Sequence, residues 1–167
     1  MDTFILIGIT GIGLGALYFL VASGLSLIYG LMGVLNFAHG SFLSVGAFVG
    51  YWVATQLGPD TTMTDFILAM IVGGLAAGLF ALLIEQLLIT RLYDRHIDQA
   101  LVTVGVSLVV GAVLGGWFGN DLIMFPTPLW FLTAVNVGGA MIPADRIVYI
   151  ATAVLLLIAN LSLIHIS

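Results

Sequence analysis

Residues 3–57 read TFILIGITGIGLGALYFLVASGLSLIYGLMGVLNFAHGSFLSVGAFVGYWVATQL and contain no Asp, Glu, Lys or Arg. A membrane-spanning helix needs about 20 apolar residues to cross a hydrocarbon core about 30 Å thick. The stretch is therefore too long for one such helix and has about the right length for two. The break between them falls near residues 30–41, where glycines gather with Asn36 and His39. This pattern predicts two apolar helices separated by a polar interruption.

The composition of the whole chain extends this prediction. Of 167 residues, 62% are hydrophobic and 7% are charged, whereas soluble domains average about 45–50% and about 25%. So few charges cannot cover a water-soluble globule, so we predict an integral membrane protein. A soluble enzyme and a nucleic-acid binder are excluded, and the net charge of −5 offers no basic surface for phosphates. The absence of cysteine excludes a disulfide-bonded scaffold and thiolate metal sites.

Apolar runs and turn-forming residues predict an all-α bundle of about five membrane-spanning helices. The predicted helices are residues 4–31, 41–57, 66–90, 100–117 and 147 onward. Ser41 is the candidate N-cap of the second helix, and Thr64 or Asp65 is that of the third. Residues 58–65 and 119–145 are predicted loops, the longer one because prolines, asparagines and aromatic residues are interleaved there.

The arginines predict the orientation of the chain. Arg91 and Arg95 lie in one short charged loop, and arginine is enriched in cytoplasmic loops. We therefore expect this loop inside the cell and the loops at 58–65 and 119–145 outside. The N-terminus lies outside if both first helices cross completely, and its side changes if residues 32–40 are re-entrant.

Glycines four residues apart recur through the apolar segments. The pairs are Gly11 and Gly15, Gly46 and Gly50, Gly74 and Gly78, and Gly111 and Gly115. Membrane helices associate through small residues that let backbones approach closely. The spacing therefore predicts a tightly packed helix bundle.

The polar residues around the break leave two interpretations open. Asn36, His39, Ser41 and Ser44 either cap two helix ends at the membrane interface, or Asn36 and His39 line or gate a path for a solute. Under the second interpretation, Gly40 also shapes the path, and Gly30 and Gly33 permit the bend.

No residue pattern predicts catalysis or metal binding. His39 has no orienting carboxylate in the first two predicted helices, and no metal-ligand spacing such as HExxH occurs. Glu85 has no second ionisable group at similar depth, which disfavours a proton-coupled carrier, and we expect it near the cytoplasmic headgroups and Arg91. We expect no catalytic residue, no metal and no cofactor.

The run Tyr29–Gly40, YGLMGVLNFAHG, carries a family resemblance. It closely resembles the N-terminal part of the LivH-type inner-membrane permeases of branched-chain amino acid ABC importers. The following Gly46-Ala47 pair fits the same family. The segments at 84–91 and 101–107 look like its cytoplasmic loop and the helix after it.

This resemblance implies a multi-pass permease subunit in the bilayer of the bacterial inner membrane, translocating branched-chain or related small amino acids. It also implies a second permease subunit, two cytoplasmic ATPase subunits and a periplasmic substrate-binding protein as partners. Permeases for urea and short amides share a similar motif and stay an alternative. A self-sufficient channel or secondary carrier is the alternative outside the family.

Members of this family are nearly twice as long as the present chain. We therefore expect residues 1–160 to be the N-terminal part of a permease transmembrane domain, without the second-half loop that docks the ATPase. Residues 161–167, LSLIHIS, break the preceding apolar pattern and resemble translated adapter sequence. We treat them as a candidate non-native tail.

Overall fold

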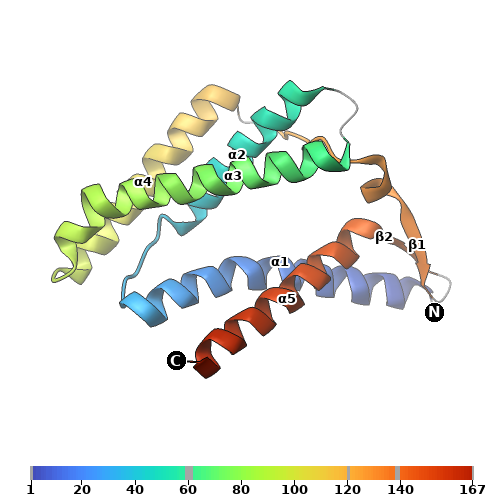
Figure 1. Cartoon of the computed structure of the whole chain (residues 1–167), viewed down its shortest axis with the longest axis horizontal. Helices are drawn as coiled ribbons and strands as arrows, with labels where there is room; N and C mark the ends of the chain where they lie inside the picture. The colour runs from blue at the N-terminus through green and yellow to red at the C-terminus, as the bar shows by residue number, and fades with distance from the viewer. Residues whose placement is uncertain (1, 59–61, 120, 138–139, 167) are drawn as a thin grey trace. The chain divides into compact units, whose positions relative to one another are not determined.

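The computed structural model describes residues 2–58, 62–119, 121–137 and 140–166. Within them the chain forms α1 (Asp2–Met32), α2 (His39–Leu57), α3 (Met63–Ile84), α4 (His96–Phe118) and α5 (Ala144–Ile166). A π-helical turn, η1 (Glu85–Ile89), and a 3₁₀ turn, η2 (Thr90–Leu92), extend α3 (Figure 1). A further 3₁₀ turn, η3 (Leu129–Leu132), precedes the strands β1 (Ala134–Val137) and β2 (Ala140–Pro143).

The chain divides into two compact units, Leu25–Pro128 and Met1–Gly24 with Leu129–Ser167. The first unit holds the break, α2, α3 and α4, and the second holds most of α1 together with η3, the strands and α5. The helical fold confirms the all-α prediction, and every predicted helix has its counterpart. The short strand pair lies in residues 119–145, which the sequence predicted as a loop.

The predicted helix caps are wrong in detail. The α2 helix begins at His39 after Ala38, which makes no side-chain cap, so Ser41 lies inside the helix rather than at its N-cap. The N-cap of α3 is Thr62, whose side chain accepts from the Asp65 N–H, while the Thr62 N–H donates to Asp65 Oδ2 at 3.0 Å. This reciprocal capping box satisfies two backbone N–H groups at once, and it starts the helix earlier than Thr64 would.

In the Leu25–Pro128 unit, α2 packs on α3 through its smallest residues. Its buried residues recur every four positions, at Phe42, Gly46, Gly50 and Ala54. The fit is so close that a Cβ added at Gly73 of α3 would stand 2.5 Å from the carbonyl oxygen of Gly46. The two backbones therefore touch directly, as small residues permit.

The glycine pairs predicted from the sequence differ in how closely other residues surround them. Gly46 and Gly50 are enclosed by α3, whereas a Cβ at Gly74 or Gly78 would meet nothing within 4 Å. The glycine of α3 that contacts α2 is Gly73, one position before the predicted pair. A Cβ at Gly11, Gly15 or Gly111 would also meet no neighbour within 4 Å.

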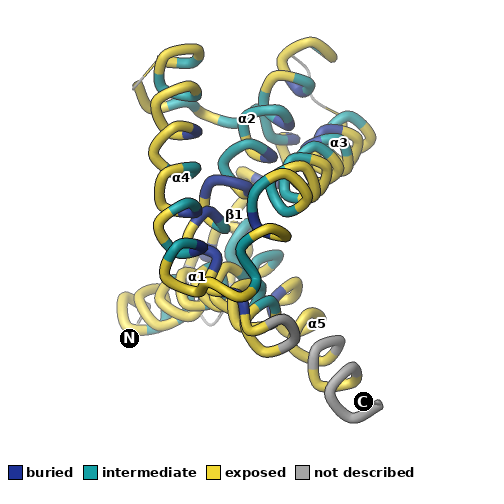
Figure 2. Tube along the Cα trace, turned by 90° about the vertical axis from the view of Figure 1, so that its left-hand side faces the viewer, coloured by how far each residue is buried: buried dark blue, intermediate teal, exposed yellow. Residues whose placement is uncertain are grey.

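Three helical segments in the described residues are long and apolar enough to cross a membrane: Thr3–Gly30, Met63–Leu92 and His96–Phe118. The predicted total of about five spans stays a prediction. The outer faces of α3 and α4 carry large exposed apolar side chains such as Leu79 and Leu108, and their buried residues face inward (Figure 2). Such faces suit contact with lipid.

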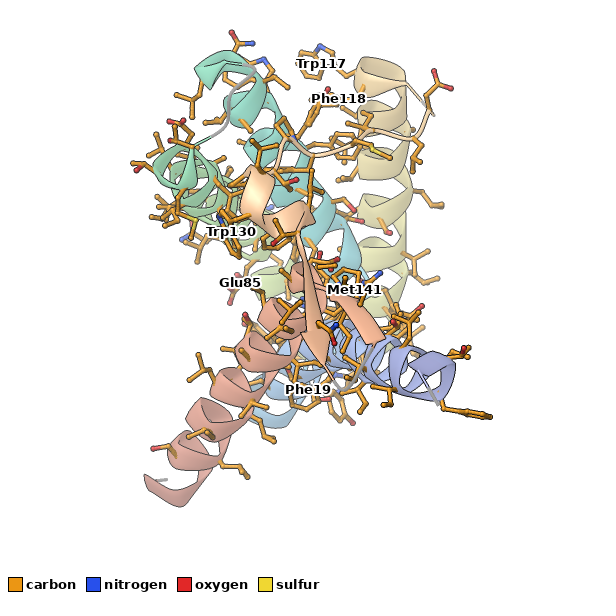
Figure 3. All side chains as sticks on the ribbon, turned by 90° about the vertical axis from the view of Figure 1, so that its right-hand side faces the viewer. Phe19, Glu85, Trp117, Phe118, Trp130 and Met141 are labelled. Carbon is orange, nitrogen blue, oxygen red and sulfur yellow. The ribbon has the colours of Figure 1, made fainter. Side chains whose placement is uncertain are left out.

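The Met1–Gly24 and Leu129–Ser167 unit contains the strand pair. Strands β1 and β2 are antiparallel, with Val135 opposite Ile142, and Ile142 is fully buried. Trp130 of η3 (Figure 3) stacks edge-on against Phe131 at 5.2 Å between ring centres. The α5 helix continues through residues 161–166 of the candidate tail; Ser167 lies outside the described residues.

Candidate functional site

The segment between α1 and α2 begins with a glycine that ends α1. The Gly33 N–H donates to the Tyr29 carbonyl at 2.9 Å, and Gly33 has a φ of +65°. Only glycine adopts this left-handed conformation without steric cost, which is why helices often end on it. Gly30 lies before it, exposed in the last turns of α1, where a Cβ would meet nothing within 4 Å.

Asn36 is buried and holds the turn that starts α2. Its Oδ1 accepts from the Ala38 N–H at 3.0 Å, and its carbonyl accepts from the His39 N–H at 3.3 Å. Asparagine favours such turns because its side chain imitates a backbone acceptor. Asn36 thus shapes the turn before α2, whose N-cap residue, Ala38, makes no side-chain cap. His39 is partly exposed and Gly40 is exposed, both in the first turn of α2.

Two hydrogen bonds join the segment and α2 to α4. The Phe37 N–H donates to Thr103 Oγ1 at 3.2 Å, and Ser41 Oγ donates to Ser107 Oγ at 3.0 Å. Both bonds connect residues 66 positions apart, so the chain after residue 36 runs parallel to α4. The break and the start of α2 are thus attached to α4 by these two polar contacts.

The polar residues of α4 lie on one face because they are four positions apart. They are Gln99, Thr103 and Ser107, followed by Gly111 and Gly115. Gln99 is 1% exposed, and its side-chain Oε1 and Nε2 have no hydrogen-bond partner among the described residues. This face was not predicted from the sequence, although the spacing of four residues between its polar side chains was a usable signal.

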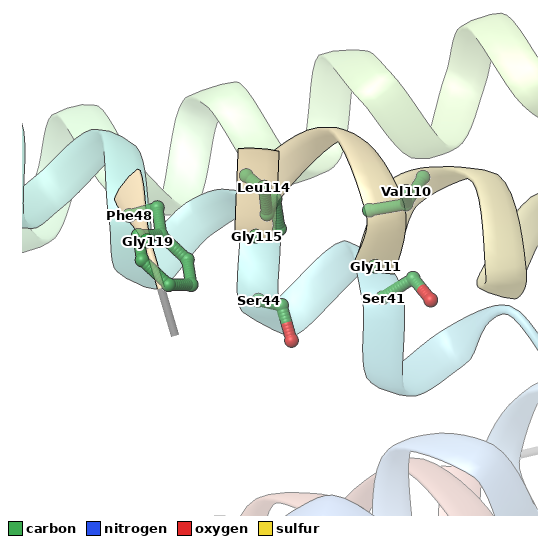
Figure 4. A pocket seen from close by; sticks show the side chains of 8 residues that line it. All are labelled: Ser41, Ser44, Phe48, Val110, Gly111, Leu114, Gly115 and Gly119. Carbon is green, nitrogen blue, oxygen red and sulfur yellow. The ribbon is translucent and has the colours of Figure 1, made fainter. Parts of the chain in front are cut away.

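A groove opens between α2 and α4 beyond these hydrogen bonds. Its volume is about 230 Å³. The lining residues are Ser41, Ser44 and Phe48 of α2, and Val110, Gly111, Leu114, Gly115 and Gly119 on or after α4 (Figure 4). Phe48 also contacts Phe118, with 4.6 Å between the ring centres. The side chains that line the groove are apolar apart from the two serine hydroxyl groups.

The charged loop after α3 lies apart from this groove. Arg91 and Arg95 are exposed, and Arg95 pairs with Asp98 at 3.6 Å. Glu85 Oε1 accepts a hydrogen bond from the Tyr93 hydroxyl at 3.1 Å. Partial burial, this hydrogen bond and the nearby carboxylate raise the pKa of Tyr93 above its ordinary value, so the hydroxyl stays a donor.

No group of three His, Cys, Asp or Glu side chains in the described residues is placed to hold a metal ion. The polar side chains of the break, α2 and α4 described above carry amide, hydroxyl and imidazole groups.

Comparison with known proteins places the chain in a transport family. Residues 7–165 match the family described as "Branched-chain amino acid transport system / permease component". The match covers nearly the whole chain, so the chain belongs to this family of membrane permeases, and it is a transport component by family.

Individual relatives match over shorter segments. The chain is 38% identical over 55 residues to the high-affinity branched-chain amino acid transport system permease protein LivH of Salmonella typhimurium, covering 31% of this chain and 18% of that protein. It is 35% identical over 49 residues to the corresponding BraD protein of Pseudomonas aeruginosa, covering 29% of this chain and 16% of that protein. No solved structure matches significantly.

Proposed function

We propose that the chain is a permease subunit of an ABC importer that carries branched-chain or related small amino acids across the bacterial inner membrane. The observation that carries this proposal is the family match over residues 7–165. The LivH and BraD relatives are named as high-affinity branched-chain amino acid permeases. A second permease, two ATPases that supply the energy and a periplasmic binding protein complete the proposed importer.

The packing of α2 and α4 supports a transport role. The two apolar helices share a part-buried hydroxyl pair, Ser41 and Ser107, and α4 also carries the buried amide of Gln99. Polar groups inside a membrane bundle are costly and commonly mark a solute pathway. We place Asn36, His39 and Gly40 along this path, with Gly30 and Gly33 permitting the bend that opens it. The loop with Arg91 and Arg95 faces the cytoplasm in this proposal.

The test is ATP-dependent uptake. The gene, in its natural reading frame, is expressed with the permease, ATPase and binding-protein genes beside it in a strain unable to import leucine. We expect radiolabelled leucine uptake that disappears when the phosphate-binding lysine of the ATPases is replaced. Uptake that survives this replacement contradicts an ABC importer and favours a channel or secondary carrier. Uptake of urea in place of leucine favours an amide permease.

The path residues need a separate test. Asn36→Ala and His39→Ala are expected to lower leucine uptake while leaving the amount of protein in the membrane unchanged. Thr55→Ala is the control, because the exposed Thr55 bonds only to Trp52 O in its own helix. Unchanged uptake kinetics in both variants contradict the assignment of these residues to the path.

A further inference from the structure

The groove between α2 and α4 has two chemically different parts. Ser41 and Ser44 stand at one side of it, and Phe48, Val110 and Leu114 supply apolar surface (Figure 4). We propose that this groove binds a branched-chain amino acid, with the ammonium group at the serine oxygens and the aliphatic side chain against the apolar residues. The inference rests on the proposed function and names the place in this chain where the solute is held.

The hydroxyl groups select for a hydrogen-bond donor. Ser41 Oγ donates to Ser107 Oγ at 3.0 Å, and Ser44 Oγ donates to the Gly40 carbonyl at 3.0 Å. A hydroxyl has one hydrogen to donate and two lone pairs that accept. Because the hydrogens of both serines are already engaged, their oxygens are left as acceptors. An ammonium group carries three donors and no acceptor, and therefore complements them.

The rest of the lining selects for a small apolar side chain and against net charge. No charged residue lines the groove, and an unpaired ion would lose its hydration there without compensation. A zwitterion has no net charge, but its carboxylate still needs hydrogen-bond donors, and in this proposal water at the open side of the groove supplies them. The volume of about 230 Å³ is below the roughly 300–1,000 Å³ typical of sites for drug-sized ligands. It suits a solute of amino-acid size.

Glycine keeps this space open on the α4 side. A Cβ at Gly111 would meet no protein atom within 4 Å, so a larger residue there fills the groove without displacing α2. A lipid acyl chain would also fit apolar surface, but it offers no donor to the two serine oxygens. The acceptor pair therefore favours an amino acid over a lipid.

Gly111→Val tests the assignment against a matched control, Gly105→Val. Gly105 lies on the same helix, its Cβ would also meet nothing within 4 Å, and it does not line the groove. Both variants make the same change in helix propensity. In the assembled importer, we expect Gly111→Val to raise the KM for leucine about tenfold and to affect alanine less, whose methyl group needs less room. Gly105→Val is expected to leave both unchanged.

A photoreactive leucine analogue provides an independent readout in membranes that contain the complex. Labelling that falls within residues 41–48 or 110–119, competes with leucine and weakens in Gly111→Val supports the site. Labelling elsewhere, labelling that leucine does not compete, or equal labelling in the two valine variants overturns it. If wild-type cells import leucine and both variants behave alike, the groove assignment fails while the proposed function stands. If no branched-chain amino acid is imported but labelling in the groove is competed, the proposed function fails and the site stands.

Discussion

The α2 helix meets its two neighbours through two different kinds of contact. Toward α3 it presents glycines, and the backbones approach so closely that even a methyl group at Gly73 has no room. Toward α4 it presents serines and Phe48, with one hydroxyl–hydroxyl bond and a groove. The first contact depends on shape and leaves no freedom to separate. The second depends on a few polar bonds, each of which contributes little to stability, and it is the contact on which the proposed path relies.

The largest effect is expected from adding a side chain where the backbones of α2 and α3 touch. Gly73→Val is expected to destabilise the protein by about 3 kcal/mol, because overpacking forces α2 and α3 apart. Thermal unfolding in lipid nanodiscs, followed by circular dichroism, measures the loss. Gly74→Val is the control, since a Cβ there would meet nothing within 4 Å. Equal effects of the two variants would contradict the close contact.

A smaller loss of stability is expected from a substitution at Gly33, where α1 ends. Gly33→Val places a β-branched residue at a φ of +65°, which costs about 1–2 kcal/mol. The same unfolding measurement applies, with Gly8→Val as a control in the open helical part of α1. A Gly33→Val protein as stable as this control would show that the left-handed turn is not required.

A substitution on the polar face of α4 should change the protein locally rather than throughout. Thr103→Val removes the acceptor of the Phe37 N–H and is expected to cost about 1 kcal/mol. Hydrogen exchange should become faster at residues 33–38 and stay unchanged at the α2–α3 contact. Thr55→Val, which alters a hydroxyl bonded only within its own helix, should leave the exchange at residues 33–38 unchanged. Equal exchange in the two variants argues against the attachment of the break to α4.

The smallest effect is expected for the serine pair. Hydrogen bonds between membrane helices are worth about 0.6 kcal/mol on average, so Ser107→Ala should shift the unfolding temperature only slightly. If the bond to Ser41 is the cause, the double variant with Ser41→Ala loses less than the sum of the two single variants. Additive losses would mean that the two serines act independently.

Local sequence signals predicted the helices better than they predicted the caps. The apolar runs located all five helices, because a hydrophobic run of suitable length has few alternatives in a membrane. Ser41 and Thr62 show the limit of such signals. Serine and threonine are both good N-caps. Thr62 caps α3 in a reciprocal pair with Asp65, whereas the Ser41 hydroxyl donates a hydrogen bond to Ser107, far away in the chain.

The candidate site was predicted only in part. Asn36 and Gly33 stood out as breaks in an apolar run, and the structure gives Asn36 a turn hydrogen bond and Gly33 a positive φ. Thr103, Ser107 and Gln99 did not stand out, because isolated polar residues are common in such helices. Their importance appears only when α4 lies beside α2 and the spacing of four residues brings them to one face.

The sequence by itself determined that this protein is a helical membrane permease. Its lack of charge leaves no soluble alternative, its apolar runs match the bilayer, and the YGLMGVLNFAHG motif carries the family. Only the tertiary structure decided that Gly73 rather than Gly74 contacts α2, that residues 134–137 pair with residues 140–143 as strands, and that a groove opens beside Gly111. These features depend on the register between segments far apart in the chain, and register is set by packing rather than by local composition.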